Sequence, residues 1–508
     1  MKKMKSICDS IQKISIYYVF CCIVLFMCGI IVGISVQKFN IENRSLGEII
    51  VFASVFAVAM SIYILAILYG YSRKKLTIDM LVRIIVLGGF ILKIIYIVYT
   101  PITIRSDDVY TINDTGHMGY IYTIFSTYMF PTNPASGWEF PQPPLHHIIA
   151  AIWIKLFDFV GFSLEWLCES VQFLTTIYTT LTVIIADKLY CELSDKETGR
   201  LFTVCCVTFL PYMIVMSGDA NNDALLTLLM TTIILLTVRW WKEPKYKNIV
   251  YIAIVFGLAM MTKYSVALLV PPITFVFAVR FFGEKNYLSY IKQFLLFLAV
   301  CGPICLWWPI RLLIMYDLPF GFVQASKVSE PQYIGGFSAF ERLFDFSNKL
   351  NHSYIVWDNL SKECDYNIFI NLIKSACFGE QDFITYNEVL NIVGDILFFV
   401  MIAFTSVVVY LFIKWIAKGD SIITVRIFLS SICIIVGMSA VIRTLTPRMA
   451  FICNSNIRFI VVAVLLYYVI VGLMINNSNK QIINICYSFC GLLTVLSSTM
   501  WILCLMYH

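Results

Sequence analysis

Charged residues are scarce in this chain of 508 residues: only 13% are Asp, Glu, Lys or Arg, and only five residues are histidine. Hydrophobic residues make up 60% of the chain, and the mean hydropathy is +0.82. Apolar runs of about 20 residues recur, whereas short alternating strands of the kind that build a membrane β-barrel are missing. The composition therefore predicts an all-α polytopic membrane protein.

A strong excess of positive charge is also missing, because the formal net charge is only +6. The basic residues cluster in short segments between apolar runs, which is typical of orientation in an anionic lipid bilayer. We therefore expect the bilayer, and no nucleic acid, as a partner. The sequence also shows no internal repeat of the kind found in many secondary transporters.

No small-residue cleavage site follows the first apolar run, at about 14–36, so we expect an uncleaved first span with its N-terminus inside. The basic group at 73–75 predicts a cytoplasmic loop after a second span. A third span, at about 80–100, then delivers residues 101–147 to the outer face. Three apolar stretches lie between 148 and 216. If the turn 217–223 is also on the outer face, the chain must cross the membrane an even number of times between the two outer segments, so one of the three stretches is expected to be short or interfacial.

This pattern predicts a helical bundle of about 12 to 14 transmembrane helices, in which outer-face loops form the site. The predicted divisions are N-terminal transmembrane helices (1–100), a first large extracytoplasmic loop with the active site (101–147), a transmembrane core (148–311), a second extracytoplasmic segment (312–387) and C-terminal transmembrane helices (388–508).

The first large loop is the richest in chemically active side chains. It holds Asp107 and Asp108 together with three of the five histidines, namely His117, His146 and His147. Long loops of this kind commonly bind or catalyse. The other predicted outer-face segments add Asn222-Asp223 and the cations Lys263, Arg311, Arg443, Arg448 and Arg458. Acids beside cations suit a reaction in which a hydroxyl loses a proton while a phosphate leaves.

Several short motifs resemble one family when they are taken in order. They are Arg105-Ser-Asp-Asp108-Val, Gly116-His117-Met-Gly119-Tyr120, Gln142-Pro143-Pro144-Leu145-His146-His147, Asn222-Asp223-Ala224, Thr262-Lys263-Tyr264, Trp308-Pro309-Ile310-Arg311, Phe378-Gly379-Glu380 and Asn456-Ile457-Arg458-Phe459. This pattern is similar to that of bacterial family-39-like glycosyltransferases of the GT-C class, which are related to protein O-mannosyltransferases and lipid A aminoarabinose transferases. Two positions depart from it: Asp107 stands where histidine is frequent, and Phe459 where tyrosine is commoner.

The resemblance implies a GT-C-like fold and an enzyme that transfers a sugar, with inversion, from a polyprenyl-phosphate donor on the outer face of the bacterial cytoplasmic membrane. It implies Asp108 as the general base, with Asp107 as the alternative. Lys263, Arg311 and Arg458 would bind the lipid phosphate. A second acidic or acceptor site would comprise Asp223, Asn222, His117, His146 and His147. The acceptor is an envelope polymer, a lipid or a protein, and the use of a divalent cation is left open.

Other interpretations of the same residues remain. Asp108 and Asp223 are good helix N-caps, and Lys263 and Arg458 are suited to anchoring helices at the interface. The histidines lack regular metal-ligand spacing. At the level of the whole chain, a transporter or flippase of a lipid-linked or anionic substrate is the alternative, and a non-catalytic subunit that binds a lipid-linked sugar is a third hypothesis.

Overall fold

The computed structural model describes residues 77–99, 102, 112–324, 328–347, 349–381, 388–418 and 421–507. The described residues belong to one compact unit, residues 76–508. Two predicted spans, at about 14–36 and 49–70, lie outside them, and so do Asp107 and Asp108, the predicted catalytic acids.

The described part of the chain is built of helices, with one isolated β-bridge between Tyr333 and Phe451. Eight helical segments are long and apolar enough to cross a membrane. They are α3 (Ile78–Tyr99), α6 (Leu164–Leu193), α9 (Asp223–Lys242), η2 (Tyr264–Leu269) continued by α11 (Val270–Gly283), α12 (Tyr287–Tyr316), α15 (Glu388–Lys418), α16 (Ile423–Leu445) and α18 (Lys480–Tyr507). The prediction of an all-α, multi-pass membrane protein is confirmed.

The helices α7 (Glu197–Phe209) and α8 (Pro211–Gly218) are bent by 45° at the break between them; together they are long and apolar enough for a broken span, which would be the ninth crossing, or for a re-entrant loop. Pro211 has no amide hydrogen to continue the helix of α7, so the chain starts a new helix at this residue. Every residue of α8 is buried, and so is the turn Ser217–Asp223 that follows it. The sequence predicted this turn on the outer face; the structure buries it beneath neighbouring loops.

Shorter helices complete the unit. They are α4 (His117–Thr127), α5 (Leu145–Val160), α10 (Tyr246–Met260), α13 (Ala339–Phe344), α14 (Ile368–Phe378) and α17 (Val461–Ile475), with 3-10 turns η1 (Pro134–Ser136), η4 (Pro447–Met449), η5 (Ile452–Ser455) and η6 (Ile457–Phe459). Of the three apolar stretches between 148 and 216, α5 is the short one, as the sequence predicted. It ends at Gly161, whose φ of +90° suits a residue without a side chain.

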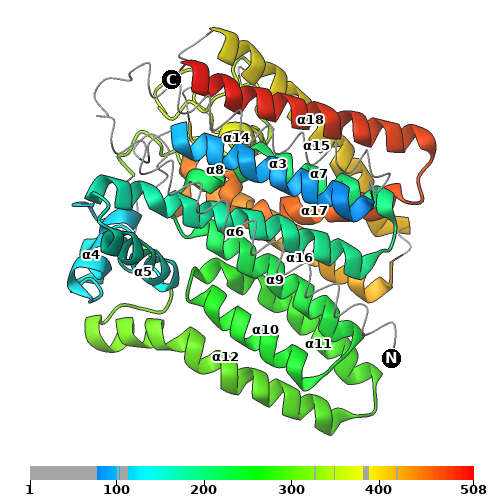
Figure 1. Ribbon diagram of the computed structural model, residues 1–508, viewed down its shortest axis with the longest axis horizontal. Helices are drawn as coiled ribbons and strands as arrows, with labels where there is room; N and C mark the ends of the chain where they lie inside the picture. Colours follow the sequence, from blue (N-terminus) through cyan, green and yellow to red (C-terminus); the bar gives the residue numbers. More distant parts are fainter. Residues whose placement is uncertain are drawn as a thin grey trace. The chain divides into compact units, whose positions relative to one another are not determined.

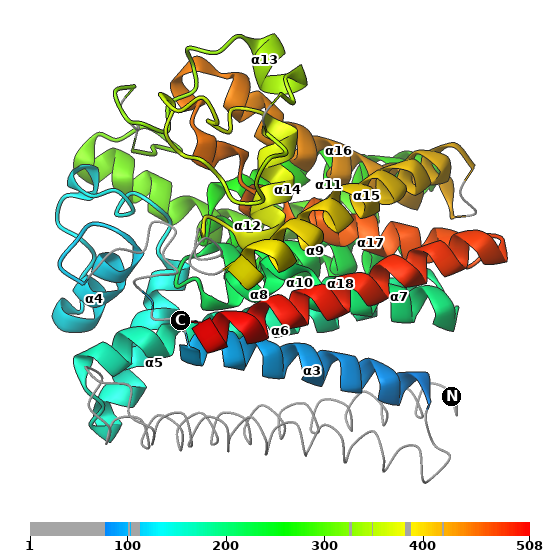
Figure 2. The same ribbon diagram turned by 90° about the horizontal axis from the view of Figure 1, so that it is seen from above.

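The long helices run alongside one another, and the connections differ at their two ends (Figures 1 and 2). One end, which we call the long-loop end, holds α4, α5, the turn 217–222 and the segments 317–324, 328–347, 349–381 and 446–460. At the other, the short-loop end, brief connections such as 194–196, 243–245 and 284–286 join the helices. The helix α12 extends to Tyr316, slightly beyond the predicted division at 311.

Candidate functional site at the long-loop end

The first large loop folds around its histidines. His117 begins α4, and its Nδ1 lies 3.0 Å from Nε2 of His147 in the first turn of α5. The Glu139 Oε2 atom lies 3.5 Å from His117 Nε2. On the other side of His147, the ring of Tyr120 stacks with a centroid distance of 4.1 Å. The structure thus brings His117 and His147 together, although they are 30 residues apart.

These histidines are held neutral by their surroundings. Burial lowers the pKa of His117 well below its usual value, and the neighbouring His147, His146, Lys263 and Arg458 lower it further. Burial likewise lowers the pKa of His146 to about 4. The Nε2 atom of His146 lies 3.1 Å from the Ala220 carbonyl oxygen, which fits an imidazole that donates from this nitrogen.

The turn before α9 is hydrogen-bonded to two other loops, those that contain Gln142 and Thr262. Asn222 Nδ2 donates to Gln142 Oε1 at 2.6 Å and to the Thr262 carbonyl oxygen at 3.1 Å. Its neighbour Asp223 forms an ion pair with Lys263, with 2.6 Å between Oδ1 and Nζ. The sequence assigned Asp223 to the acceptor side and Lys263 to the lipid phosphate; in the structure the two residues touch.

Three cations surround the ring of Phe459. The distances to the ring centroid are 3.7 Å from the Arg443 guanidinium, 4.9 Å from that of Arg458 and 5.4 Å from Lys263 Nζ. Rings attract cations through the negative face of their π system, yet neutralise none of their charge. We call Lys263, Arg443 and Arg458 the cation cluster.

Arg311, the third predicted phosphate ligand, is held elsewhere. Its guanidinium lies 5.0 Å from the ring centroid of Trp308, 5.3 Å from that of Phe130 and 5.3 Å from that of Tyr316. Its Nη2 donates to the Tyr316 hydroxyl at 3.2 Å, while within the described residues its buried Nη1 has no hydrogen-bond partner. The charge of Arg311 acts on Tyr120, beside the histidines.

A buried polar network supports the turn that carries Arg458. Asn371 on α14 donates to Ser455 Oγ at 2.9 Å, and the Ile457 amide donates to Ser375 Oγ at 2.9 Å. After α14, Glu380 Oε1 accepts from Asn456 Nδ2 at 3.0 Å and lies 3.9 Å from Arg458 Nη2.

The base of this network is the ion pair of Asp365 and Lys374, in which Nζ lies 2.9 Å from each carboxylate oxygen and both side chains are fully buried. Sequence reasoning missed this support. The motif Phe378-Gly379-Glu380, which is part of the family resemblance, was a sequence signal for this region, but no role was assigned to it.

The described residues contain no group of three or more His, Cys, Asp or Glu side chains arranged to hold a metal ion. His117 lies directly against both His147 and Glu139. The use of a divalent cation, which the sequence left open, is not decided by this arrangement.

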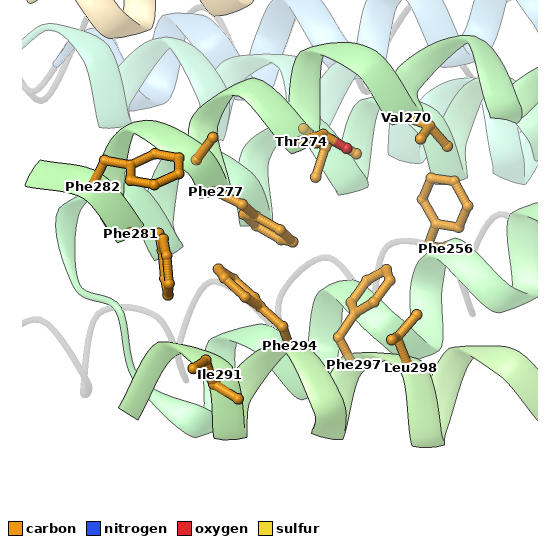
Figure 3. Close-up of a pocket in the computed structure, with 12 residues that line it drawn as sticks. Phe256, Val270, Thr274, Phe277, Phe281, Phe282, Ile291, Phe294, Phe297 and Leu298 are labelled. Atoms are coloured by element: carbon orange, nitrogen blue, oxygen red, sulfur yellow. The ribbon is translucent and has the colours of Figure 1, made fainter. Parts of the chain in front are cut away.

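An apolar cavity of about 460 Å³ lies among α10, α11 and α12. In Figure 3, Phe277 from α11 and Phe294 from α12 project into this space, and their rings stack with 5.2 Å between centroids. Of the side chains that line it, only Thr274 carries a polar atom.

Residues 141–308 match the model of the dolichyl-phosphate-mannose-protein mannosyltransferase family. The matched segment begins in the first large loop and ends in α12, and it includes His146, His147, Asn222, Asp223 and Lys263. The match confirms the resemblance to protein O-mannosyltransferases that the sequence predicted, over about a third of the chain.

Among solved structures, the crystal structure of the Archaeoglobus fulgidus oligosaccharyltransferase complex with Zn and sulfate is similar over 82% of this chain, at 12% sequence identity and a TM-score of 0.42. The chain spans about half of that protein, 53% of its length. This likeness is too weak to support an argument about the site. No curated protein matches the chain significantly.

Proposed function

We propose that this protein transfers a sugar from a polyprenyl-phosphate donor to a hydroxyl acceptor, with inversion, at the outer face of the cell membrane. The observation that carries the proposal is the cation cluster of Lys263, Arg443 and Arg458 around Phe459, at one end of a membrane bundle whose core matches a lipid-linked mannosyltransferase family. Such a cluster suits a phosphate that gains charge as it leaves.

In this proposal, the acceptor hydroxyl gives its proton to Asp108, or to Asp107, as its oxygen attacks the anomeric carbon of the sugar. The bond between that carbon and the phosphate oxygen breaks on the opposite face, and polyprenyl phosphate leaves. Lys263 and Arg458, joined by Arg443, bind the phosphate oxygens, because guanidinium groups match them with two parallel hydrogen bonds. Arg311 contacts the donor phosphate from the side on which Tyr120 lies.

The cavity among α10, α11 and α12 is where we propose that the polyprenyl tail lies. Two of the helices that line the cavity are connected to a proposed phosphate ligand. Lys263 directly precedes η2 and α11, and Arg311 lies on α12. From Leu298 at the cavity to Arg311, the helix rises about 20 Å, a length that several isoprene units of an extended tail would span. The aromatic lining offers the tail an apolar surface.

The acceptor side of the proposal consists of Asn222, His117, His146 and His147. These buried groups are neutral and hydrogen-bonded, which suits contact with hydroxyls of an envelope polymer, a lipid or a protein. The orientation follows from the cations at the short-loop end, such as Arg239, Lys242 and Lys245, since basic loops favour the cytoplasmic side.

The test is to purify the protein into nanodiscs and to supply a panel of polyprenyl-phosphate sugars with crude envelope acceptors. We expect release of polyprenyl phosphate that depends on the acceptor. We also expect that Asp108→Asn lowers the rate by about 10²- to 10⁴-fold while donor binding is retained. Asp114→Asn, an exposed acid of the same loop, is the matched control. The same assay with a chelator tests the need for a divalent cation.

Two other results would replace the proposal. If every donor stays intact while a labelled lipid crosses the bilayer, the protein is a transporter or flippase. If the donor binds without turnover by the intact chain, the protein is a binding subunit. An unchanged rate in Asp108→Asn would remove this residue from the chemistry and leave Asp107 as the candidate.

A further inference from the structure

Asp223 lies among cations that, under the proposed function, bind phosphate. Its Oδ1 atom is 2.6 Å from Lys263 Nζ, and its charge also acts on Arg443. Another carboxylate near the cation cluster is that of Glu380, 3.9 Å from Arg458. The pair of Asp223 and Lys263 thus sits at the point where a phosphate would compete with a carboxylate for the same ammonium group.

The two partners of this pair differ in freedom. The Asp223 side chain is only 4% exposed, and it stands at the start of α9, where its amide donates to Asn221 Oδ1 at 3.0 Å. The Lys263 side chain is 19% exposed and has four rotatable carbons. The aspartate is therefore fixed, whereas the lysine can turn between the aspartate and a nearby anion.

The substrate and product of the proposed reaction differ in charge. The donor is a phosphodiester with one negative charge. The product, polyprenyl phosphate, is a monoester with a charge of about −1.5 to −2 at neutral pH. A site that held only cations would bind the product more tightly than the donor, and product release would then limit turnover.

We propose that Asp223 is a positioning residue that offsets this preference. Its carboxylate lowers the net charge of the cation cluster and takes back Lys263 when the sugar has been transferred, so that the monoester leaves. This inference rests on the proposed function and gives Asp223 a role in product release, in place of the acceptor-side role that the resemblance implied.

The experiment compares two inhibitors of the nanodisc protein: polyprenyl phosphate, which is the monoester, and its methyl phosphodiester, which has the charge of the donor but no sugar. The inhibition constant of each inhibitor is measured for wild type and for Asp223→Asn. One assay measures inhibition of donor turnover, and the other measures displacement of a bound fluorescent polyprenyl phosphate. Asp187→Asn is the matched control, because Asp187 pairs with Arg200 at the short-loop end.

We expect Asp223→Asn to tighten binding of the monoester, relative to the diester, by about five- to tenfold. The Asp223→Glu variant, which keeps the charge, should stay close to the wild-type ratio, and Asp187→Asn should equal it. If Asp223→Asn does not fold, Asp223→Ser serves, and the displacement assay needs no turnover.

An unchanged monoester-to-diester ratio in a folded, donor-binding Asp223→Asn or Asp223→Ser protein overturns the inference, and so does an equal shift in Asp187→Asn. A wild-type protein that turns over no donor overturns the proposed function instead, so the two failures are distinguishable.

Discussion

The two ends of the bundle hold their cations in different ways. At the short-loop end, cations pair with carboxylates: Arg200 lies 2.7 Å from Asp187 and 2.6 Å from Asp79, and Arg239 lies 2.7 Å from Glu192. At the long-loop end, Arg311 and Arg443 lie against aromatic rings, and within the described residues neither forms an ion pair with a carboxylate.

This difference separates cations that stabilise the fold through ion pairs from cations that could still bind an anion. A carboxylate that pairs with an arginine occupies the donors of its planar fork. A ring beneath the guanidinium plane leaves the N–H groups at its edge unoccupied. Arg311 and Arg443 therefore keep N–H groups that could bind phosphate, while Arg200 and Arg239 at the short-loop end have theirs occupied by carboxylates.

The largest effect is expected at a long-loop-end cation that does pair with a carboxylate, Lys374 in its buried pair with Asp365. Lys374→Met leaves Asp365 buried without its cation, and we expect a loss of about 3 to 5 kcal/mol of unfolding free energy. Lys242→Met, which breaks a half-exposed pair with Glu192 at the short-loop end, should cost less than about 1 kcal/mol. Denaturant unfolding measures both. Equal losses of unfolding free energy in the two variants would contradict the expected difference between the buried and the half-exposed pair.

A second effect concerns pH, because the four described histidines all lie at the long-loop end. The folded-state pKa of His146 is lowered to about 4, so below pH 6.5 the unfolded chain binds a proton that the folded chain does not. Stability should therefore fall as the pH decreases from about 6.5 to 4, by on the order of 3 kcal/mol for this residue. His146→Asn should flatten the slope of unfolding temperature against pH. The same slope in both proteins would refute the assignment.

A third effect tests the cation cluster directly. Lys263→Met and Arg458→Met should each weaken donor binding by about 10- to 100-fold, since hydrogen bonds to charged groups contribute roughly 1.5 to 3 kcal/mol. Arg239→Met, whose cation is already paired at the short-loop end, should leave donor affinity unchanged. Equilibrium binding of a labelled donor decides between these outcomes. A comparable loss in Arg239→Met would show that the two ends are not distinct.

The smallest effect sharpens the role of the ring. Phe459→Leu removes the aromatic face beneath three cations and should weaken donor binding by about 2- to 5-fold, in keeping with cation–π contributions of roughly 0.5 to 1 kcal/mol at exposed sites. Phe459→Tyr keeps the ring and should bind as wild type does. If leucine and tyrosine behave alike in the same binding assay, the ring does not organise the cluster.

Much of the fold was predictable because a membrane leaves few choices. Apolar runs had to become helices, and parity of crossings required a short stretch such as α5. The burial of Ser217–Asp223 was not predictable, since a polar turn reads as exposed. It is buried because Pro211 interrupts the span and because Gln142 and Thr262 accept the hydrogen bonds of Asn222.

The candidate site was predictable in its residue types but not in its pairings. Lys263 and Arg458 were assigned a common ligand, and in the structure both lie beside Phe459. Arg311 was grouped with them, yet its aromatic neighbours hold it at a separate place. Sequence spacing does not report contacts between residues nearly 200 positions apart, so the roles of Phe459 and of α14 depended on the tertiary fold.

The starts of three helices meet at the long-loop end. His117 is the first residue of α4, His146 and His147 lie in the first turn of α5, and Asp223 begins α9. A helix start exposes backbone N–H groups and carries the positive end of the helix macrodipole. Peptide dipoles do not titrate. The starts of α4, α5 and α9 therefore place positive partial charges beside the buried histidines, and these charges persist while the histidines are neutral.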